Sequence, residues 1–183
     1  MCLKLCKTKR VKIKGRRTIT LRRPKMSDVK QLKDYINTLV DEDALIKMTE
    51  KQSLKEERTW LKGVLERIRK SELHKFVAEY NGEIIGSVEL RKGKWRQSHI
   101  AEVAISVKKN YRRLGVGTAL MKRILEIGKN DKEIKLIYIR VYEQNKPAAK
   151  MYKKMGFKKV ARLKKRVQYK GKLGDEFILD FKG

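Results

Sequence analysis

A turn that contains two glycines lies past the middle of the chain, between a predicted strand and a predicted helix. The first backbone N–H groups of a helix have no carbonyl partner, and the helix dipole makes this end positive. Glycines remove side chains that would keep the backbone away from a ligand, and arginines add positive charge for phosphate. The segment therefore predicts a phosphate site. Its residues are Arg112, Arg113, Leu114, Gly115, Val116, Gly117 and Thr118.

Three kinds of phosphate-binding turn have glycines at comparable spacing. The P-loop pattern G-x-x-x-x-G-K-[ST] does not occur in this chain. The dinucleotide-binding fingerprint needs a third glycine where this chain has Leu120, and it usually opens a βαβ unit early in a fold. The arrangement that remains is [Q/R]-x-x-G-x-[G/A], which Arg112, Gly115 and Gly117 match.

A second group of residues follows this turn. A predicted strand ends at Val141, and the residues that carry the pattern after it are Asn145, Ala148, Ala149, Tyr152, Gly156 and Phe157. In this order and with this gap, the two groups resemble the GNAT superfamily of acetyl-CoA-dependent N-acetyltransferases, over about residues 18–181. The resemblance implies transfer of an acetyl group to a primary amine: a protein N-terminus, a lysine, or a small amine or amino acid.

The resemblance also implies roles on the acetyl-donor side. Backbone groups of the strand before the turn would bind the pantetheine arm, and backbone amides of the turn would hold the pyrophosphate. Asn145 would hydrogen-bond the pantetheine, and Tyr152 would donate a proton to the leaving thiolate, although Tyr152 also fits a core aromatic. The residues expected to bind acetyl-CoA are Ile105, Ser106, Val107, Arg112, Arg113, Leu114, Gly115, Val116, Gly117, Thr118, Asn145 and Tyr152.

The acceptor side is less determined. The attacking amine must be neutral, and Glu102, at the start of the cofactor strand, is the candidate general base. Asp175 and Glu176, before the last strand, are candidates to meet an incoming ammonium, or they simply offset nearby Lys and Arg charge. Direct attack in a ternary complex is expected, because no cysteine lies near the motifs. Arg140 occupies the position where ribosomal-protein acetyltransferases of this superfamily often carry a catalytic Glu, which weakens that assignment.

The charge of the chain suggests a second class of function. Lys and Arg number 49 against 21 Asp and Glu, for a net charge of +28. Such a field attracts polyanions, so the alternative is a nucleic-acid- or ribosome-binding protein that uses its basic N-terminal arm and Lys-rich C-terminal third. A thermophile-like composition explains the density of charge but not the imbalance. The same field disfavours a polyamine acceptor.

The chain of 183 residues is expected to form one N-acetyltransferase domain, residues 18–183, after a mobile basic arm, residues 1–17. Cys2 and Cys6 in the arm are expected to be free thiols, and no metal site is expected. No apolar segment is long enough to cross a membrane or to act as a secretory signal, so a cytoplasmic location is expected. The oligomeric state stays open, with a homodimer among the possibilities.

The expected fold is α+β: a central, mostly antiparallel, twisted sheet of about seven strands flanked by about four helices, of the kind the superfamily has. Ser27 and Ser53 are the expected N-caps of the first two helices. Asn81-Gly82 predicts a hairpin turn. The strands are expected at 18–22, 74–80, 83–90, 100–107, 134–141, 160–169 and 176–181, and the other two helices at 117–128 and 147–155.

Overall fold

The computed structural model describes residues 7–181, so the prediction of free thiols at Cys2 and Cys6 falls outside the described residues. Within that range, no helix combines the length and the apolar character needed to cross a membrane. The helices are α1 (Val29–Asp41), α2 (Leu54–Arg69), α3 (Val116–Asn130) and α4 (Lys146–Lys154). The strands are β1 (Lys9–Lys12), β2 (Thr18–Arg22), β3 (Leu73–Tyr80), β4 (Glu83–Lys92), β5 (Ile100–Val107), β6 (Leu136–Tyr142), β7 (Phe157–Tyr169) and β8 (Lys172–Phe181).

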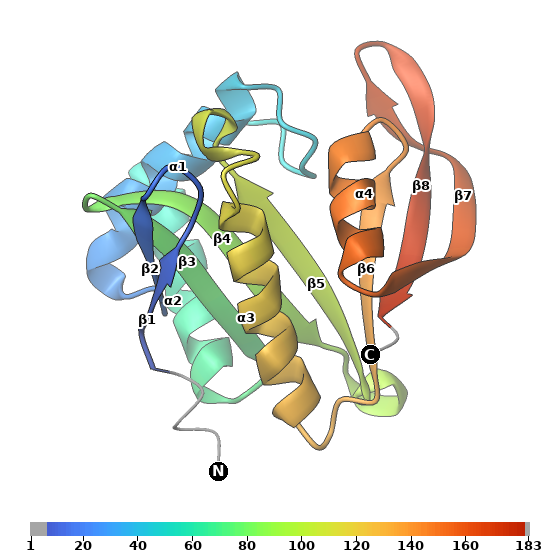
Figure 1. Ribbon diagram of the computed structural model, residues 1–183, viewed down its shortest axis with the longest axis horizontal. Coiled ribbons are helices and arrows are strands. Elements are labelled where there is room, and N and C mark those ends of the chain that lie inside the picture. Colours follow the sequence, from blue (N-terminus) through green and yellow to red (C-terminus); the bar gives the residue numbers. More distant parts are fainter. Residues whose placement is uncertain (1–6, 182–183) are drawn as a thin grey trace. The chain divides into compact units, whose positions relative to one another are not determined.

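The predicted fold class is confirmed: a mixed, mostly antiparallel sheet accompanies four α-helices (Figure 1). The strand order is β1-β2-β3-β4-β5-β6-β8-β7, and β5 and β6 pair in parallel. One strand was not predicted. Within the expected arm, β1 pairs antiparallel with β2 from Lys9↔Leu21 to Lys12↔Thr18. Its four residues carry one apolar side chain, Val11, which is too weak a pattern to predict a strand from sequence.

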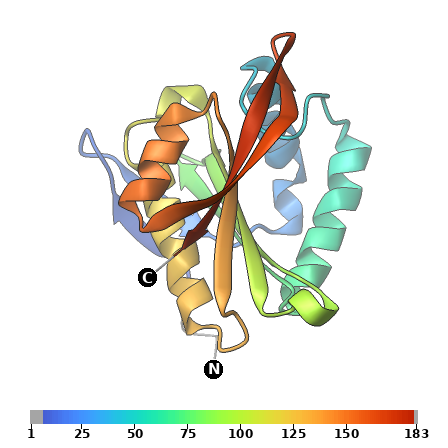
Figure 2. The same cartoon turned by 90° about the vertical axis from the view of Figure 1, so that its right-hand side faces the viewer.

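By contact density the chain divides into two units, and β5 contributes to both. The first unit takes the described residues up to Arg91 together with Ile105–Asp131. In it, α1 and α2 cover one face of the antiparallel strands, and α3 covers the other (Figures 1 and 2). The alternation of β3 serves both faces: Val77 packs in the α1–α2 core, while Phe76 lies under the Arg123 side chain of α3.

Local sequence signals set the limits of several elements in this unit. At the start of α2, Ser53 accepts a hydrogen bond from the Glu56 amide (3.3 Å) and donates its own amide to the Glu56 carboxylate (2.8 Å), so the predicted capping box is confirmed. The turn between β3 and β4 has positive φ at Asn81 (50°) and Gly82 (79°), as predicted for a hairpin.

The predicted N-cap of α1 is wrong. Ser27 lies inside a 3₁₀ turn, Met26–Asp28, and Asp28 is the residue that precedes α1. The Asp28 carboxylate is buried, accepts the Lys25 amide (2.8 Å) and pairs with Arg22 (2.7 Å). A carboxylate with two such partners satisfies the start of the element better than a serine hydroxyl, and the sequence did not reveal the partner on β2.

The second unit takes Lys92–Ala104 and the described residues from Lys132 on. Here β5 pairs parallel with β6 from Ile100↔Leu136 to Val103↔Ile139, β6 pairs antiparallel with β8, and β8 pairs with β7. Helix α4 packs through Tyr152 on Phe157, with ring centroids 5.9 Å apart, and Gly156 with φ of 97° follows it. The pairing of β7 with β8 shifts register at two places along β7.

A buried carboxyl group makes the stability of the first unit depend on pH. Glu57 of α2 is 5% exposed, and burial raises its pKa from 4.5 to about 7, although the charge of Lys75 acts in the opposite direction. The folded chain therefore favours the protonated carboxyl. Its stabilisation is complete below pH 4.5 and is lost as the pH rises through about 7.

We expect Glu57→Gln to be as stable as the parent chain at about pH 4 and more stable by about 1 to 2 kcal/mol at about pH 8. Urea unfolding at the two pH values measures this difference. Glu50→Gln, which replaces an exposed carboxylate before α2, is the control and should leave the pH dependence unchanged. A Glu57→Gln chain that is less stable than the parent at pH 8 would contradict the effect.

Candidate functional site

The predicted strand, turn and helix meet at the N-terminus of α3 in the first unit. Gly115 is the N-cap, with φ of 98° in the left-handed region, and it has no side chain to cap the helix. The first backbone bond of the helix runs from the Ala119 amide to the Gly115 carbonyl (2.9 Å). The amides of Val116, Gly117 and Thr118 precede that bond, so they have no helical partner and remain donors for an anion.

The two arginines of the turn differ in their surroundings. Arg112 donates through Nε to the Val107 carbonyl (2.9 Å) and through Nη2 to Glu42 (2.7 Å), and Glu42 also accepts the Lys109 amide. Arg112 therefore braces the turn, and its charge is already paired. Arg113 has φ of 62° and is exposed, and among residues 7–181 no acid lies within ion-pair distance of it. Glu42 gave no sequence signal, because it lies 70 residues from Arg112.

The end of β5 is held by two neighbours that sequence reasoning also missed. The Ser106 hydroxyl and the hydroxyl of Tyr35 on α1 lie 2.8 Å apart, and burial raises the pKa of Tyr35, so this phenol stays protonated. Gly86 of β4 permits close packing, because a Cβ there would lie 3.0 Å from Leu120 Cδ1 and 3.3 Å from the Ser106 carbonyl oxygen. The backbone expected to bind pantetheine thus lies in a rigid strand end.

In the second unit, Asn145 is the N-cap of α4. Its Oδ1 accepts the Ala148 amide (3.3 Å), and its own amide donates to the Tyr142 carbonyl (2.8 Å). Its Nδ2 has no hydrogen-bond partner within residues 7–181. One side chain can therefore cap the helix and still donate to a ligand.

Tyr152, on the same helix, has a buried ring and a hydroxyl group that makes no hydrogen bond to another described residue. Its ring is 5% exposed and packs on Phe157, as a core aromatic does. Its hydroxyl makes no hydrogen bond to another residue of the described chain. Burial raises the pKa of Tyr152, so the phenol stays protonated at neutral pH and keeps a proton to donate.

Arg140 brings two of the candidate acceptor residues together. Its Nε lies 3.6 Å from Glu102 Oε1, and its Nη1 lies 3.2 Å from Glu176 Oε2. Partial burial works against the charge of Arg140, but the neighbouring carboxylates outweigh it and raise the pKa of Arg140. We call Glu102, Arg140 and Glu176 the Arg140 cluster.

Asp175 is placed differently from Glu176. One of its oxygens accepts the Lys165 amide (2.9 Å), and the other pairs with Arg162. These two partners hold the pKa of Asp175 below its ordinary value. Its carboxylate thus joins β8 to the irregular part of β7. Of the acidic candidates, Glu102 and Glu176 both lie next to Arg140.

Comparison with curated proteins places this geometry in a family. The family model described as Acetyltransferase (GNAT) family matches residues 37–157. An N-alpha-acetyltransferase of Sulfurisphaera tokodaii is 34% identical over 106 residues, which cover 52% of this chain and 63% of the relative. The L-amino acid N-acetyltransferase AaaT of Escherichia coli is 33% identical over 86 residues, which cover 46% and 53%. The chain thus spans between about half and two thirds of the length of these relatives.

Solved structures agree on the fold. A ribosomal-protein-alanine N-acetyltransferase of Brucella melitensis superposes with a TM-score of 0.76 at 21% identity, over 87% of this chain and 97% of that one. The acetyltransferase YncA of Salmonella typhimurium, solved with acetyl-CoA, gives 0.77 at 16% identity, over 90% and 93%. At these identities the likeness concerns the fold alone. With the family model across two thirds of its length, the chain belongs to the GNAT acetyltransferase family.

Proposed function

We propose that the protein transfers the acetyl group of acetyl-CoA to an α-amino group, at the N-terminus of a protein or peptide or on a free amino acid. The observation that carries the proposal is the bare first turn of α3 behind Gly115, in the position of the family's glycine motif. The relatives named for an N-terminal α-amine and for L-amino acids have this acceptor group in common.

On the donor side, the amides from Arg113 to Thr118 hold the pyrophosphate, and Arg112 keeps their loop in shape through Glu42. The backbone from Ile105 to Val107 pairs with the pantetheine arm. The Val107 carbonyl already accepts the Arg112 guanidinium, so the backbone of Ile105 carries most of that pairing. In the second unit, Asn145 donates its Nδ2 to a pantetheine carbonyl.

On the acceptor side, the pKa of the amine decides how much help it needs. At about pH 7.4 about a quarter of the α-amine at a protein or peptide N-terminus is neutral, against about one in a thousand for a lysine side chain. The Arg140 cluster contributes two carboxyl groups that attract an ammonium, and Glu102 takes the proton as general base. Because an N-terminal α-amine loses its proton more easily than a lysine side chain, it depends less on a strong base.

The transfer itself needs one further proton. The neutral nitrogen attacks the thioester carbonyl, and the tetrahedral adduct loses an N–H proton to solvent. The C–S bond then breaks, and Tyr152 donates its phenolic proton to the departing thiolate. No acyl-enzyme is needed, and residues 7–181 contain no cysteine that could form one. The phenol regains a proton from solvent after the products leave.

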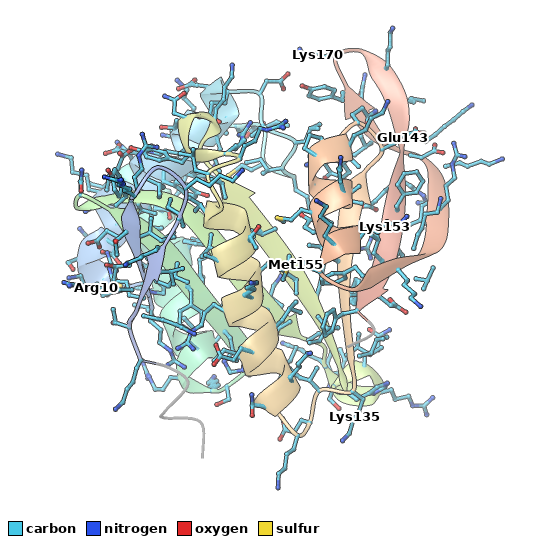
Figure 3. The ribbon with its side chains drawn as sticks, in the orientation of Figure 1. Arg10, Lys135, Glu143, Lys153, Met155 and Lys170 are labelled. Atoms are coloured by element: carbon cyan, nitrogen blue, oxygen red, sulfur yellow. The ribbon has the colours of Figure 1, made fainter. Side chains whose placement is uncertain are left out.

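The second candidate is polyanion binding, and one observation favours it. In β7, Lys158, Lys164 and Arg166 are exposed, and no acid lies between Lys158 and Arg166 in the sequence. Lys153 on α4 and Lys170 at the turn between β7 and β8 belong to the same unit (Figure 3). These cations serve no step of the acetyl transfer and are compatible with it.

Thiol release from acetyl-CoA tests the proposed function. We expect turnover with peptides and amino acids that have a free α-amine, and little with α-acetylated peptides that carry only a lysine amine. Tyr152→Phe should lower kcat by about 10²-fold with an unchanged KM for acetyl-CoA, since it keeps the ring and removes the proton donor. No release with any amine would overturn the function, and full kcat in Tyr152→Phe would overturn the role of the tyrosine.

The two roles of Asn145 can be separated by a matched pair of variants. Asn145→Ser keeps a good helix cap and loses the Nδ2 donor, whereas Asn145→Ala loses both. Both variants should raise the KM for acetyl-CoA about five- to tenfold. Only Asn145→Ala should also lower the free energy of unfolding, by about 1 kcal/mol. A normal KM in Asn145→Ser would mean that the side chain acts as a cap alone.

A further inference from the structure

The hairpin of β1 and β2 is attached directly to the glycine turn. The Lys14 amide donates to the Leu114 carbonyl (3.0 Å), and Ile13 packs over Gly115, within 3.8 Å of where a Cβ would stand. The tip is itself a tight turn: the Ile13 amide donates to the Arg17 carbonyl (2.9 Å), and Gly15 and Arg16 have positive φ. The tip of the hairpin thus has a fixed position beside the amides that face an anion.

The other end of the hairpin is fixed on the same helix. Arg123 of α3 is 5% exposed and donates to the Lys7 carbonyl (2.9 Å). Lys9 Nζ lies 3.7 Å from the carboxylate of Glu126, also on α3. The hairpin therefore runs beside α3 from the first turn of the helix to its third (Figure 1).

The hairpin carries unpaired positive charge to this place. Residues 7–17 contain no acid. Lys12, Lys14 and Arg16 are exposed, and no acid among the described residues lies within ion-pair distance of them. Arg113 of the adjoining turn is likewise exposed and has no acid among the described residues within ion-pair distance, whereas Arg112 is neutralised by Glu42. Like charges held together on rigid backbone repel each other, and a bound anion would relieve this repulsion.

We propose that the hairpin tip, through Lys14 and Arg16, forms with Arg113 the subsite for the 3′-phosphate of coenzyme A. This inference rests on the proposed function. The pyrophosphate is satisfied by backbone amides, but the ribose 3′-phosphate is a doubly charged monoester that needs cationic donors of its own. The unpaired cations that adjoin the glycine turn supply them. The basic hairpin is then part of the cofactor site, and it selects coenzyme A over its dephosphorylated form.

Titration calorimetry with coenzyme A and with dephospho-coenzyme A tests the subsite. We expect the full chain to bind coenzyme A about tenfold more tightly, as two or three exposed ion pairs allow. Lys14→Gln with Arg16→Gln should reduce this ratio to about two and leave the affinity for dephospho-coenzyme A within about twofold. Lys55→Gln with Lys62→Gln removes the same charge from the exposed side of α2, on the other face of the sheet, and should keep the ratio.

The outcomes separate this inference from the function on which it rests. Equal binding of the two ligands by the parent chain, or an unchanged ratio in the hairpin variant, overturns the subsite and leaves the acetyltransferase function intact. A ratio that falls equally in the α2 control assigns the effect to general charge and also overturns it. No binding of either ligand overturns the proposed function and the subsite together.

Discussion

The left-handed backbone of Gly115 is the constraint on which the donor side depends. Gly115, with φ of 98°, ends the loop that follows β5 and starts α3. It places no side chain over the first turn of the helix. The chain leaves three amides unsatisfied there, which is costly unless water or an anion takes them. Two contacts accommodate this turn. Gly86 has no side chain, so α3 and β5 pack closely against it, and Ile13 packs over Gly115.

The cations around this turn divide into structural and available ones. Glu42 neutralises Arg112 and at the same time accepts the Lys109 amide, so one acid holds both ends of the loop. Exposed cations next to the turn include Arg113 and residues of the β1–β2 hairpin. Arg112 is paired and holds the shape of the loop, whereas Arg113 is available for the phosphate contact that we propose.

Features with a local cause could be predicted from the sequence. The Ser53–Glu56 capping box, the Asn81-Gly82 turn and the Gly156 helix end each depend on residues a few positions apart. Features with a distant cause could not. The Tyr35–Ser106 contact spans 71 positions, and neither residue type indicates the other. The sequence showed Arg140 as a departure from the family. Its two carboxylate partners depend on strand register, which could not be predicted from the sequence.

The Arg140 cluster raises the question of how a chain of net charge +28 receives a cationic acceptor. Long-range attraction favours the polyphosphate cofactor and opposes the ammonium, so the acceptor depends on local charge. The carboxyl groups of the Arg140 cluster attract an ammonium only over a few ångströms, because salt screens the attraction beyond about 10 Å. An acceptor that is partly neutral before it arrives meets less of this repulsion. A basic surface and an α-amine acceptor are therefore compatible, whereas polyamines with several charges would be repelled, and this selection requires no specific contact.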